Sequence, residues 1–366
     1  MHDNAHATPL QTGEPMRHPA RFGIALTVVL ATAGCSAATE GSSSAGRPTA
    51  ANAATTTLTS CGLQQSFDAP PRRAVALDQA STEILLELGL QDRMAGTANL
   101  KTKIPPQYQD SYAKIPVLAP KIATGEQLRA ATPDFVVAGS TDLFTKDRAG
   151  TREELGALKV PTFVSAVDCP QQNEPGRTPF DLLFADYENL GKVFGAEERA
   201  GKLAAEQRAA VAKAGEKAGE KDGEKAAGNG SQAEDQPTVV YLYSVFNGMP
   251  YVAGGTGLPS EMSRIVGAKN AFDDVNEDWP EVSWEEVARR DPDFIVIGDL
   301  SERGRPGDSA AEKRAAMAGH PVVSQLAAVR DRKIIEVPGI ELDPSVRSVH
   351  ALGLLAAGMK DLGHVR

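Results

Sequence analysis

The chain has 366 residues and a formal net charge of −10 at pH 7, with 41% hydrophobic and 23% charged residues. This composition is ordinary for a globular protein with room for two cores, and it excludes disorder along the whole chain. The sequence contains no basic stripe that could neutralise phosphates, which argues against nucleic acid as a partner.

A secretory pattern occupies the N-terminus. Met16–Arg21 is short and basic, Phe22–Ala33 is apolar, and a small residue with Cys35 follows. The apolar run is too short to span a bilayer, whereas a signal segment has this length and layout. We predict a signal peptide over residues 1–34, with Met16 as an alternative start because the preceding residues read unlike any signal.

Cys35 is a candidate for lipidation. A small residue before a cysteine resembles the bacterial lipobox, whose cysteine is acylated and becomes the new N-terminus, although Thr32 stands where leucine is usual. The alternative is an ordinary cleaved signal with a chance cysteine. Residues 35–60 are rich in Ser, Ala, Thr and Gly, which cannot bury enough apolar surface to fold, so we expect a disordered tether there.

Two further cysteines, Cys61 and Cys169, lie in the region that we expect to fold. In an exported protein the oxidising compartment favours their pairing, and closing so long a loop contributes about 4 kcal/mol in the chain-entropy model. We predict a disulfide, with two free buried thiols as the alternative. Neither cysteine belongs to a C-x-x-C pair, so redox catalysis and structural zinc find no support.

Residues 61–179 alternate strand-like and helix-like stretches. Arg73–Leu77 and Met94–Thr97 are the first two expected strands. The helix between them is expected to begin at Ser81 or Thr82 and to end at Gly89. Such alternation predicts an N-terminal lobe with a parallel sheet and right-handed crossovers.

Two segments of the chain repeat each other without a gap. Gly125–Gly139 and Trp284–Gly298 share a glutamate seven residues before Pro-Asp-Phe, then an apolar run, then glycine. Each predicts a short helix that ends at the proline, followed by a buried strand of a parallel sheet. The repeat predicts two similar α/β lobes with a cleft between them.

Residues 180–236 separate the lobes. Phe180–Phe194 has an amphipathic pattern and is expected to be the helix that connects the lobes. A second helix should begin at Ala196 and fray in a glycine-containing Glu/Lys repeat, because each helical glycine costs about 1 kcal/mol against alanine. A flexible insertion is expected after it, before a second α/β lobe at 237–366. There, Gly254–Gly257 lacks the context of a nucleotide-binding loop.

Several ordered motifs carry a resemblance to a known family. They are Thr82-Glu83 with Leu88-Gly89, Glu126 to Asp134, Gly267 to Asn270, Trp279 to Glu285, Pro292-Asp293 and Pro344 to Arg347. In this order they resemble the substrate-binding proteins of bacterial ABC importers for iron-siderophores, haem and cobalamin. The resemblance implies two α/β lobes with parallel sheets joined by one long α-helix, and a ligand cleft between them.

The resemblance also implies roles for single residues. Glu126 and Glu285 match the acidic residues, one in each lobe, that dock onto arginines of the permease. The alternative for both is that a glutamate at the start of a helix merely favours its dipole. Comparison with cobalamin-binding members aligns Tyr251, Trp279 and Arg347 with residues that contact the ligand. The alternative for Tyr251 and Trp279 is that they are buried residues of the core.

In lobe one the aromatic residues of those members are replaced. Leu100, Pro120 and Gly139 stand at such positions, and Gln79, Lys121 and Ser140 are nearby. This departure leaves room for a more polar, hydroxamate-like siderophore, with cobalamin or haem as the alternative. We therefore predict a monomeric, membrane-tethered lipoprotein that delivers a ferric chelate to a permease dimer and has no cofactor of its own.

Two other classes are disfavoured by the sequence. A site for bare zinc or manganese needs histidines from both lobes. The histidines after Cys35 are His320, His350 and His364, all in lobe two. An exported, lipid-anchored hydrolase is the rival from another class, but no G-x-S-x-G, H-E-x-x-H or partnered Ser-x-x-Lys motif is present. We expect a binding protein and not an enzyme.

Overall fold

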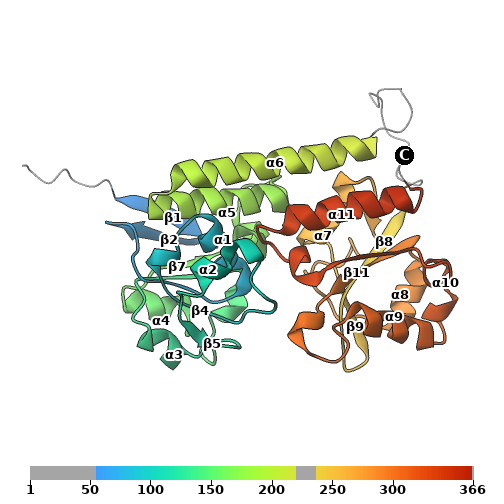
Figure 1. Cartoon of the computed structure of the whole chain (residues 1–366), viewed down its shortest axis with the longest axis horizontal. Helices are drawn as coiled ribbons and strands as arrows, with labels where there is room; N and C mark the ends of the chain where they lie inside the picture. Colours follow the sequence, from blue (N-terminus) through green and yellow to red (C-terminus); the bar gives the residue numbers. More distant parts are fainter. Residues whose placement is uncertain (1–54, 220–235, 365–366) are drawn as a thin grey trace, which may run out of the picture. The chain divides into compact units, whose positions relative to one another are not determined.

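The computed structural model describes residues 55–219 and 236–364 (Figure 1). The signal segment 1–34, Cys35, most of the expected tether and residues 220–235 of the expected insertion lie outside the described residues. No helix in the described part of the chain combines the length and the apolar character needed to cross a bilayer.

Lobe one contains a five-stranded parallel sheet in the order β5-β4-β3-β6-β7. Its strands are β3 (Ala74–Ala76), β4 (Met94–Ala98), β5 (Val117–Ala119), β6 (Phe135–Ala138) and β7 (Thr162–Val164). Its helices are α1 (Gln79–Glu87), α2 (Gln109–Tyr112), α3 (Gly125–Ala130) and α4 (Arg152–Ala157), with short 3-10 turns at Gln91–Arg93, Pro106–Tyr108, Thr141–Leu143, Ala166–Asp168 and Pro170–Gln172. The predicted parallel lobe is confirmed.

An antiparallel hairpin precedes this sheet, and it corrects the expected length of the tether. β1 (Thr56–Ser60) pairs with β2 (Leu63–Phe67), so the fold begins before Cys61. Leu58 is buried, and the ring of Phe67 packs edge-on against that of Phe135 at 5.2 Å. The β-branched threonines of β1 suit a strand, a signal that the small-residue composition masked. Cys61, at the turn, forms the predicted disulfide with Cys169.

Lobe two repeats the plan with four parallel strands in the order β10-β8-β11-β12, and β9 pairs antiparallel with β8. Its strands are β8 (Thr238–Phe246), β9 (Met249–Val252), β10 (Lys269–Asn270), β11 (Phe294–Asp299) and β12 (Ile334–Pro338). Its helices are α7 (Leu258–Ile265), α8 (Trp284–Arg290), α9 (Ala310–Gly319), α10 (Ala327–Arg330) and α11 (Ser348–Asp361), with 3-10 turns at Ser301–Arg303, Val323–Gln325 and Gly339–Leu342.

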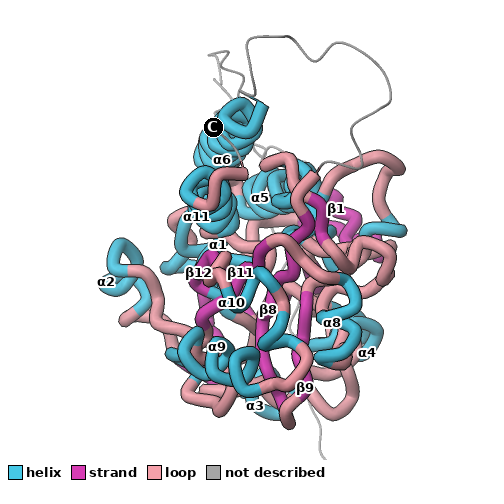
Figure 2. Tube along the Cα trace, turned by 90° about the vertical axis from the view of Figure 1, so that its right-hand side faces the viewer, coloured by secondary structure: helices cyan, strands magenta, loops and turns pink. Residues whose placement is uncertain are grey.

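Two long helices follow lobe one, and the second of them reaches both lobes. α5 (Pro179–Phe194), the expected connector, ends at Gly195, whose φ of 70° lets the chain turn back. α6 (Glu197–Gly219) packs on α5 at one end and on α7 and α11 at the other (Figures 1 and 2). α6 has 23 residues against 16 in α5, and it is α6 that packs along α11 of lobe two. The connecting helix is therefore α6.

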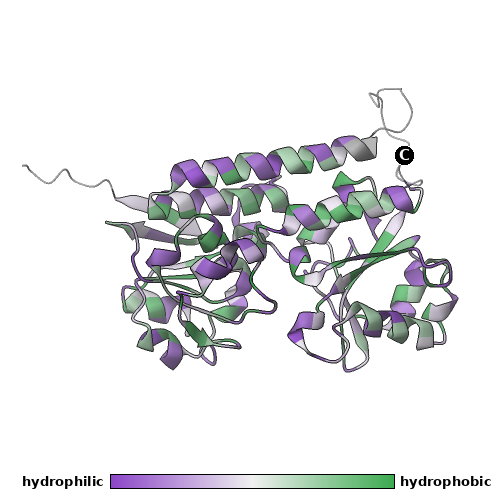
Figure 3. Ribbon diagram, in the orientation of Figure 1, coloured by the Kyte–Doolittle hydropathy of each residue, from purple (hydrophilic) through white to green (hydrophobic). Residues whose placement is uncertain are grey.

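The hydrophobic core has three parts. The largest cluster lies where α5, α6 and α11 cover the two sheets, and residues of both lobes share it, including Phe135 and Phe294. A smaller cluster covers the opposite face of each sheet. Figure 3 shows the apolar strands beneath helices whose outer turns are hydrophilic. A core shared by both lobes resists wide hinge motion, because separating them would expose apolar surface.

The sequence repeat has a structural counterpart in both lobes. Asp134 accepts hydrogen bonds from the backbone N–H groups of Arg72 and Arg73, both at 2.8 Å, just before β3. Asp293 accepts from the N–H group of Thr238 at 2.7 Å, at the start of β8. Each aspartate thus holds the beginning of the central strand against the strand that follows the aspartate itself.

Candidate ligand cleft

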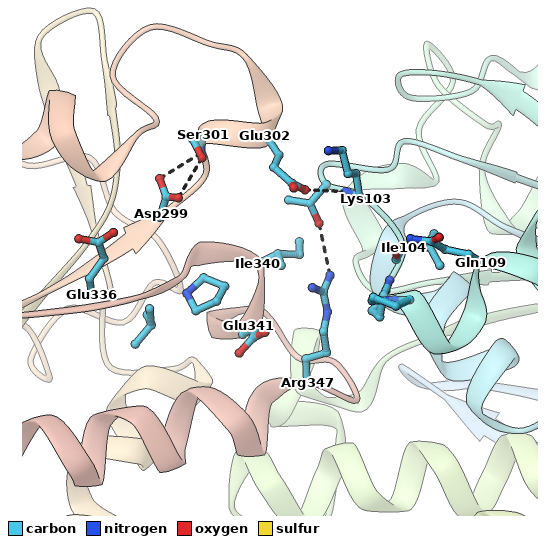
Figure 4. Close-up of a pocket in the computed structure, with 15 residues that line it drawn as sticks. Lys103, Ile104, Gln109, Asp299, Ser301, Glu302, Glu336, Ile340, Glu341 and Arg347 are labelled. Carbon is cyan, nitrogen blue, oxygen red and sulfur yellow. Dashed lines mark hydrogen bonds between the residues drawn. The ribbon is translucent and has the colours of Figure 1, made fainter.

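A cavity of about 710 Å³ lies between the two lobes (Figure 4). Its lobe-one wall consists of residues 102–106 and Gln109, and its lobe-two wall of Asp299, Ser301, Glu302, residues 336–338, Ile340 and Glu341, with Arg347 between the walls. This volume falls in the usual range for small-molecule sites. The lining combines apolar prolines, isoleucines and a valine with several carboxylates.

Arg347 lines this cavity and joins the lobes. Its guanidinium donates two parallel hydrogen bonds of 2.9 Å to the carboxylate of Glu83, and a longer one of 3.3 Å to Thr102. Burial raises the pKa of Glu83, and the Arg347 charge acts against this rise. The charge of Arg347 is therefore neutralised by a buried lobe-one carboxylate, and the pair connects α1 to the start of α11.

Lys101 forms a second connection that the sequence did not reveal. Its Nζ lies 2.9 Å from Asp343 Oδ2 and 3.3 Å from the Tyr243 hydroxyl, which itself donates to Asp343 at 2.9 Å. Desolvation disfavours the charged lysine, but the charges of Asp343 and Tyr243 and the hydrogen bonds to both together outweigh it, so the pKa of Lys101 is raised. Lys101 therefore stays charged, and its side chain extends from lobe one to Asp343 and Tyr243 of lobe two.

The loop after β4 crosses from one lobe to the other. Gln79 Oε1 accepts from the N–H groups of Lys101 and Thr102 at 2.8 Å each, and the N–H of Lys103 donates to Glu302 at 2.7 Å. Gln79 is only 1% exposed. The side chain of Gln79 therefore supports this loop from beneath and does not line the cavity, so its predicted contact with the ligand stays a prediction.

The predicted aromatic contacts lie on lobe two and are not part of the cavity lining. The ring of Trp279 stacks on that of Tyr243, with centroids 4.3 Å apart and planes at 28°, and remains half-buried. Tyr251, on β9, is also half-buried and donates its hydroxyl to Glu281, which raises the pKa of Tyr251. β9 bridges to Glu281, so both predicted aromatics belong to one edge of lobe two.

The remaining lobe-one predictions are scattered. Leu100 is half-buried and packs against the shared core, while Pro120 and Lys121 are exposed. Ser140 caps a 3-10 turn by accepting from the N–H of Asp142 at 3.2 Å. None of these residues lines the cavity of Figure 4, and of the predicted contacts only Arg347 does. The lining residues 102–106 include Pro105 and Pro106, to which the sequence analysis gave no role in ligand binding.

The acidic residue before Trp279 has a shifted pKa. Desolvation between the lobes, followed by the charges of Asp343 and Asp168, raises the pKa of Asp278 to about 7, and Lys101 acts against them. Asp278 nevertheless retains access to solvent. Asp168, from lobe one, accepts from the N–H and the hydroxyl of Thr141 at 2.8 and 2.7 Å.

The two predicted docking glutamates occupy matching places. Glu126 lies in the first turn of α3 and Glu285 in the first turn of α8, and both are exposed. Glu285 lies 3.7 Å from His320 Nε2. Figure 1 shows α3 and α8 on the side of the lobes that faces away from α6. The paired glutamates thus share one outer side.

The histidines form no metal site with other residues in the described ranges, where no group of three or more His, Cys, Asp or Glu could hold a metal ion. His350 Nδ1 lies 2.6 Å from Glu341 Oε2, and the ring of His364 lies 5.1 Å from that of Phe294. Their contacts are local to lobe two.

Comparison with known proteins now assigns the family. Residues 75–340 match the family model described as periplasmic binding protein. The chain belongs to the periplasmic binding protein family. This family implies a small-molecule ligand, an ABC permease as partner and a place outside the cytoplasm, and it excludes the hydrolase that the sequence had left as a rival.

Individual relatives agree with this assignment. The vitamin B12-binding protein of Yersinia pestis (strain Pestoides F) is 24% identical over 230 residues, which cover 62% of this chain and 69% of the relative. A periplasmic binding protein from Veillonella parvula is 28% identical with a TM-score of 0.69, covering 83% and 97% of the two chains. An ABC-type Fe3+-hydroxamate transport protein from Saccharomonospora viridis shares the fold, with a TM-score of 0.66 at 24% identity, covering 83% and 98%. The predicted two-lobe fold is confirmed.

Proposed function

We propose that this periplasmic binding protein captures a ferric-siderophore-type chelate between its lobes and delivers it to the permease of an ABC importer. The observation that carries the proposal is the inter-lobe cavity of about 710 Å³, whose walls combine prolines, isoleucines and a valine with polar groups from both lobes. A bulky, rigid chelate suits such a cavity and needs little hinge closure. The hydroxamate transport protein among the structural neighbours is consistent with this ligand class.

The chemistry of the walls favours a siderophore over haem. Haem iron in proteins is held by an axial His, Cys, Met or Tyr. The residues that line the described cavity include none of these four types. A siderophore brings all the iron ligands itself, so it needs only apolar contact and hydrogen-bonding groups from the walls. Cobalamin is the second candidate, since a relative is named as a vitamin B12-binding protein.

Tryptophan fluorescence tests the ligand class, because the chain has two tryptophans. Trp284 is buried and donates its indole N–H to the backbone carbonyl of Gly248 at 2.8 Å, so it serves as the matched control for Trp279. Ferric hydroxamates should quench the wild type and Trp284→Phe, and should quench Trp279→Phe much less. If only cobalamin or only haemin quenches the fluorescence, that compound is the ligand and the siderophore assignment is wrong. If none of these compounds quenches it, the ligand is not a metal chelate.

Delivery to the permease is proposed to depend on Glu126 and Glu285. Charge-assisted pairs at two matching points would fix the orientation of the protein on a two-fold permease. Glu126→Ala combined with Glu285→Ala should abolish uptake while ligand affinity stays unchanged. Glu153→Ala, at an exposed first-turn position of α4, is the matched control and should transport normally. A loss of affinity in the double variant would place the two glutamates in ligand binding instead.

Cys35 is proposed to carry the lipid anchor, on the sequence pattern alone. Cys35→Ser should release the protein from the membrane fraction without changing its affinity for ligand. Mass spectrometry of the mature N-terminus is the direct measurement. An unmodified Cys35, or membrane association that survives its replacement, would leave an ordinary cleaved signal as the explanation.

A further inference from the structure

The last strand of the lobe-one sheet, β7, has an outer edge that its neighbour β6 does not use. The sheet order β5-β4-β3-β6-β7 places β7 at one end. The N–H of Ser165 donates to the carbonyl oxygen of Ala138 at 3.1 Å, so residue 165 faces β6. Because the backbone groups of successive residues alternate between the two sides of a strand, Thr162 and Val164 direct theirs away from β6.

Two side chains of the hairpin β1–β2 bind these outward backbone groups. The hydroxyl of Ser60 accepts from the N–H of Val164 at 2.7 Å and donates to the carbonyl oxygen of the same residue at 2.9 Å. The amide of Gln65 does the same for Thr162, accepting from its N–H at 2.5 Å and donating to its carbonyl oxygen. Two side chains thus satisfy two donors and two acceptors that a further strand would otherwise bind.

Further contacts hold the hairpin against β7. The guanidinium of Arg152 donates to the carbonyl oxygens of Ser60 and Cys61 at 2.8 and 3.3 Å, and to the hydroxyl of Thr162 at 2.9 Å. The disulfide joins Cys61, in the hairpin turn, to Cys169 beyond the end of β7. The hairpin and β7 therefore lie in contact, although they are far apart in the sequence (Figure 1).

The form of this contact distinguishes it from an ordinary extension of the sheet. In the described structure β1 and β2 pair with each other and not with β7. A strand paired to β7 would present a new outer row of backbone donors and acceptors, whereas the side chains end the hydrogen-bond ladder at β7 itself. Uncovered edges are templates for association with another chain, and proteins commonly protect them.

We propose that the hairpin β1–β2 is a cover that prevents this protein from associating with a second copy of itself through β7. Antiparallel pairing centred on Phe163 would place Thr162 of each copy opposite Val164 of the other, and each such pair would exchange two hydrogen bonds. The strand is uncharged and rich in β-branched residues, which suits this pairing. The inference does not rest on the transport function, since none of these residues lines the cavity.

Matched double variants test the cover. Ser60→Ala with Gln65→Ala removes the side chains that bind β7, and Gln64→Ala with Ser66→Ala removes the same two residue types from exposed positions of β2. Both are compared with the disulfide intact and after reduction by a dithiol, because the intact crosslink keeps the hairpin close to β7. Cooperative thermal unfolding shows that each is folded. If the reduced double variant unfolds, Gln65→Ala against Gln64→Ala makes the same comparison at Thr162 alone.

Molecular mass and hydrogen exchange are the two measurements. With the disulfide intact, the wild type and both variants should be monomers by light scattering. After reduction, the mass of Ser60→Ala with Gln65→Ala should rise towards twice that of the monomer as the protein concentration increases, while the wild type and the control variant stay monomeric. The amides of Thr162 and Val164 should exchange rapidly in the dilute reduced variant, and slowly at concentrations where it dimerises.

Three results would overturn the cover. If the reduced Ser60→Ala, Gln65→Ala variant stays monomeric at every concentration, these side chains do not prevent association. If the control variant associates to the same extent after reduction, general destabilisation and not the uncovering of β7 is the cause. If dimers form while the amides of Thr162 and Val164 still exchange rapidly, the two copies meet through another surface.

Discussion

The two lobes share one structural unit and differ in what surrounds it. In lobe one, β3 pairs with β6 so that Ala74 lies opposite Phe135; in lobe two, β8 pairs with β11 so that Val239 lies opposite Phe294. In both units the residue before the proline has a positive φ, 46° at Thr132 and 41° at Asp291. The repeated sequence therefore specifies a turn, a clamp and a strand pairing together.

The lobes differ in the segments that each adds to this shared unit. Lobe one has the hairpin β1–β2 and the disulfide, which hold its outer part together. Lobe two has β9, which brings Tyr251 beside Glu281 at the edge with the aromatic pair. The repeated unit thus builds the scaffold, while the segments unique to each lobe add a crosslink to lobe one and an aromatic edge to lobe two.

The disulfide gives the largest expected difference between the lobes. Cys61 and Cys169 are separated by 108 residues, so the chain-entropy model assigns about 4 to 5 kcal/mol to their crosslink. Cys61→Ser with Cys169→Ser should lower the free energy of unfolding by this order, measured by denaturant titration. Hydrogen exchange should show lobe one opening before lobe two.

Reducing agent provides the control for this prediction. It should destabilise the wild type and leave the double serine variant unchanged, because the variant has no bond to reduce. Equal loss of protection in both lobes would contradict the idea that the crosslink serves lobe one alone.

The pair of Glu83 and Arg347 tests how strongly the lobes are joined. Arg347→Ala leaves the buried Glu83 without its cation, which should cost about 3 kcal/mol in unfolding free energy. The double variant Glu83→Gln with Arg347→Met should recover most of this loss, because no charge then remains buried. A double variant as unstable as Arg347→Ala would show that packing, and not charge, accounts for the cost.

The aspartates of the repeat test whether the units are equivalent. Asp134→Ala and Asp293→Ala each remove charge-assisted hydrogen bonds to the backbone at the start of a central strand, so each should cost about 2 kcal/mol. Thermal unfolding measures both. Costs that differ by more than twofold would break the equivalence, since the clamps would then depend on their surroundings.

Much of the fold was predictable because the repeat encodes it locally. α3 and β6, and α8 and β11, occupy the residues that the repeat indicated. The start of α1 was not predicted, because Asp78, and not Ser81 or Thr82, caps it by accepting from the N–H of Ser81. Phe180–Phe194 was expected to be the connecting helix, but α6 makes the larger contact with lobe two, because amphipathicity shows that a helix is covered but not by which lobe.

The ligand cleft was less predictable for a physical reason. Lys101 depends on Asp343, which lies 242 positions later in the sequence, and no local pattern reports a contact of that range. A lysine after a strand is ordinarily a solvated residue. The positions of Glu126 and Glu285 could be predicted because both open repeated helices, whereas the contacts of Lys101 and Gln79 follow from the way the lobes meet.

Buried titratable groups give the smallest expected effects, with opposite signs in the two lobes. In lobe one, burial raises the pKa of Asp186 to about 7, against hydrogen bonds from Ser165 and Ala166. Between pH 4 and 7 the folded protein keeps a proton that the unfolded chain has released, so stability falls as pH rises. In lobe two, burial lowers the pKa of Lys313 to about 8, so stability rises from about pH 8 to 10.5, where only the unfolded chain is protonated.

Each group can change the free energy of unfolding by at most about 1.4 kcal/mol per pH unit, the limit for one proton. Asp186→Asn should flatten the pH dependence of denaturant unfolding between pH 4 and 7 and leave the alkaline side unchanged, while Lys313→Met should do the reverse. Each variant is the control for the other. If Asp186→Asn changes the pH dependence above pH 7.5, or Lys313→Met changes it below, a different group titrates in that range. Flattening on both sides in one variant would mean that the lobes titrate as a single unit.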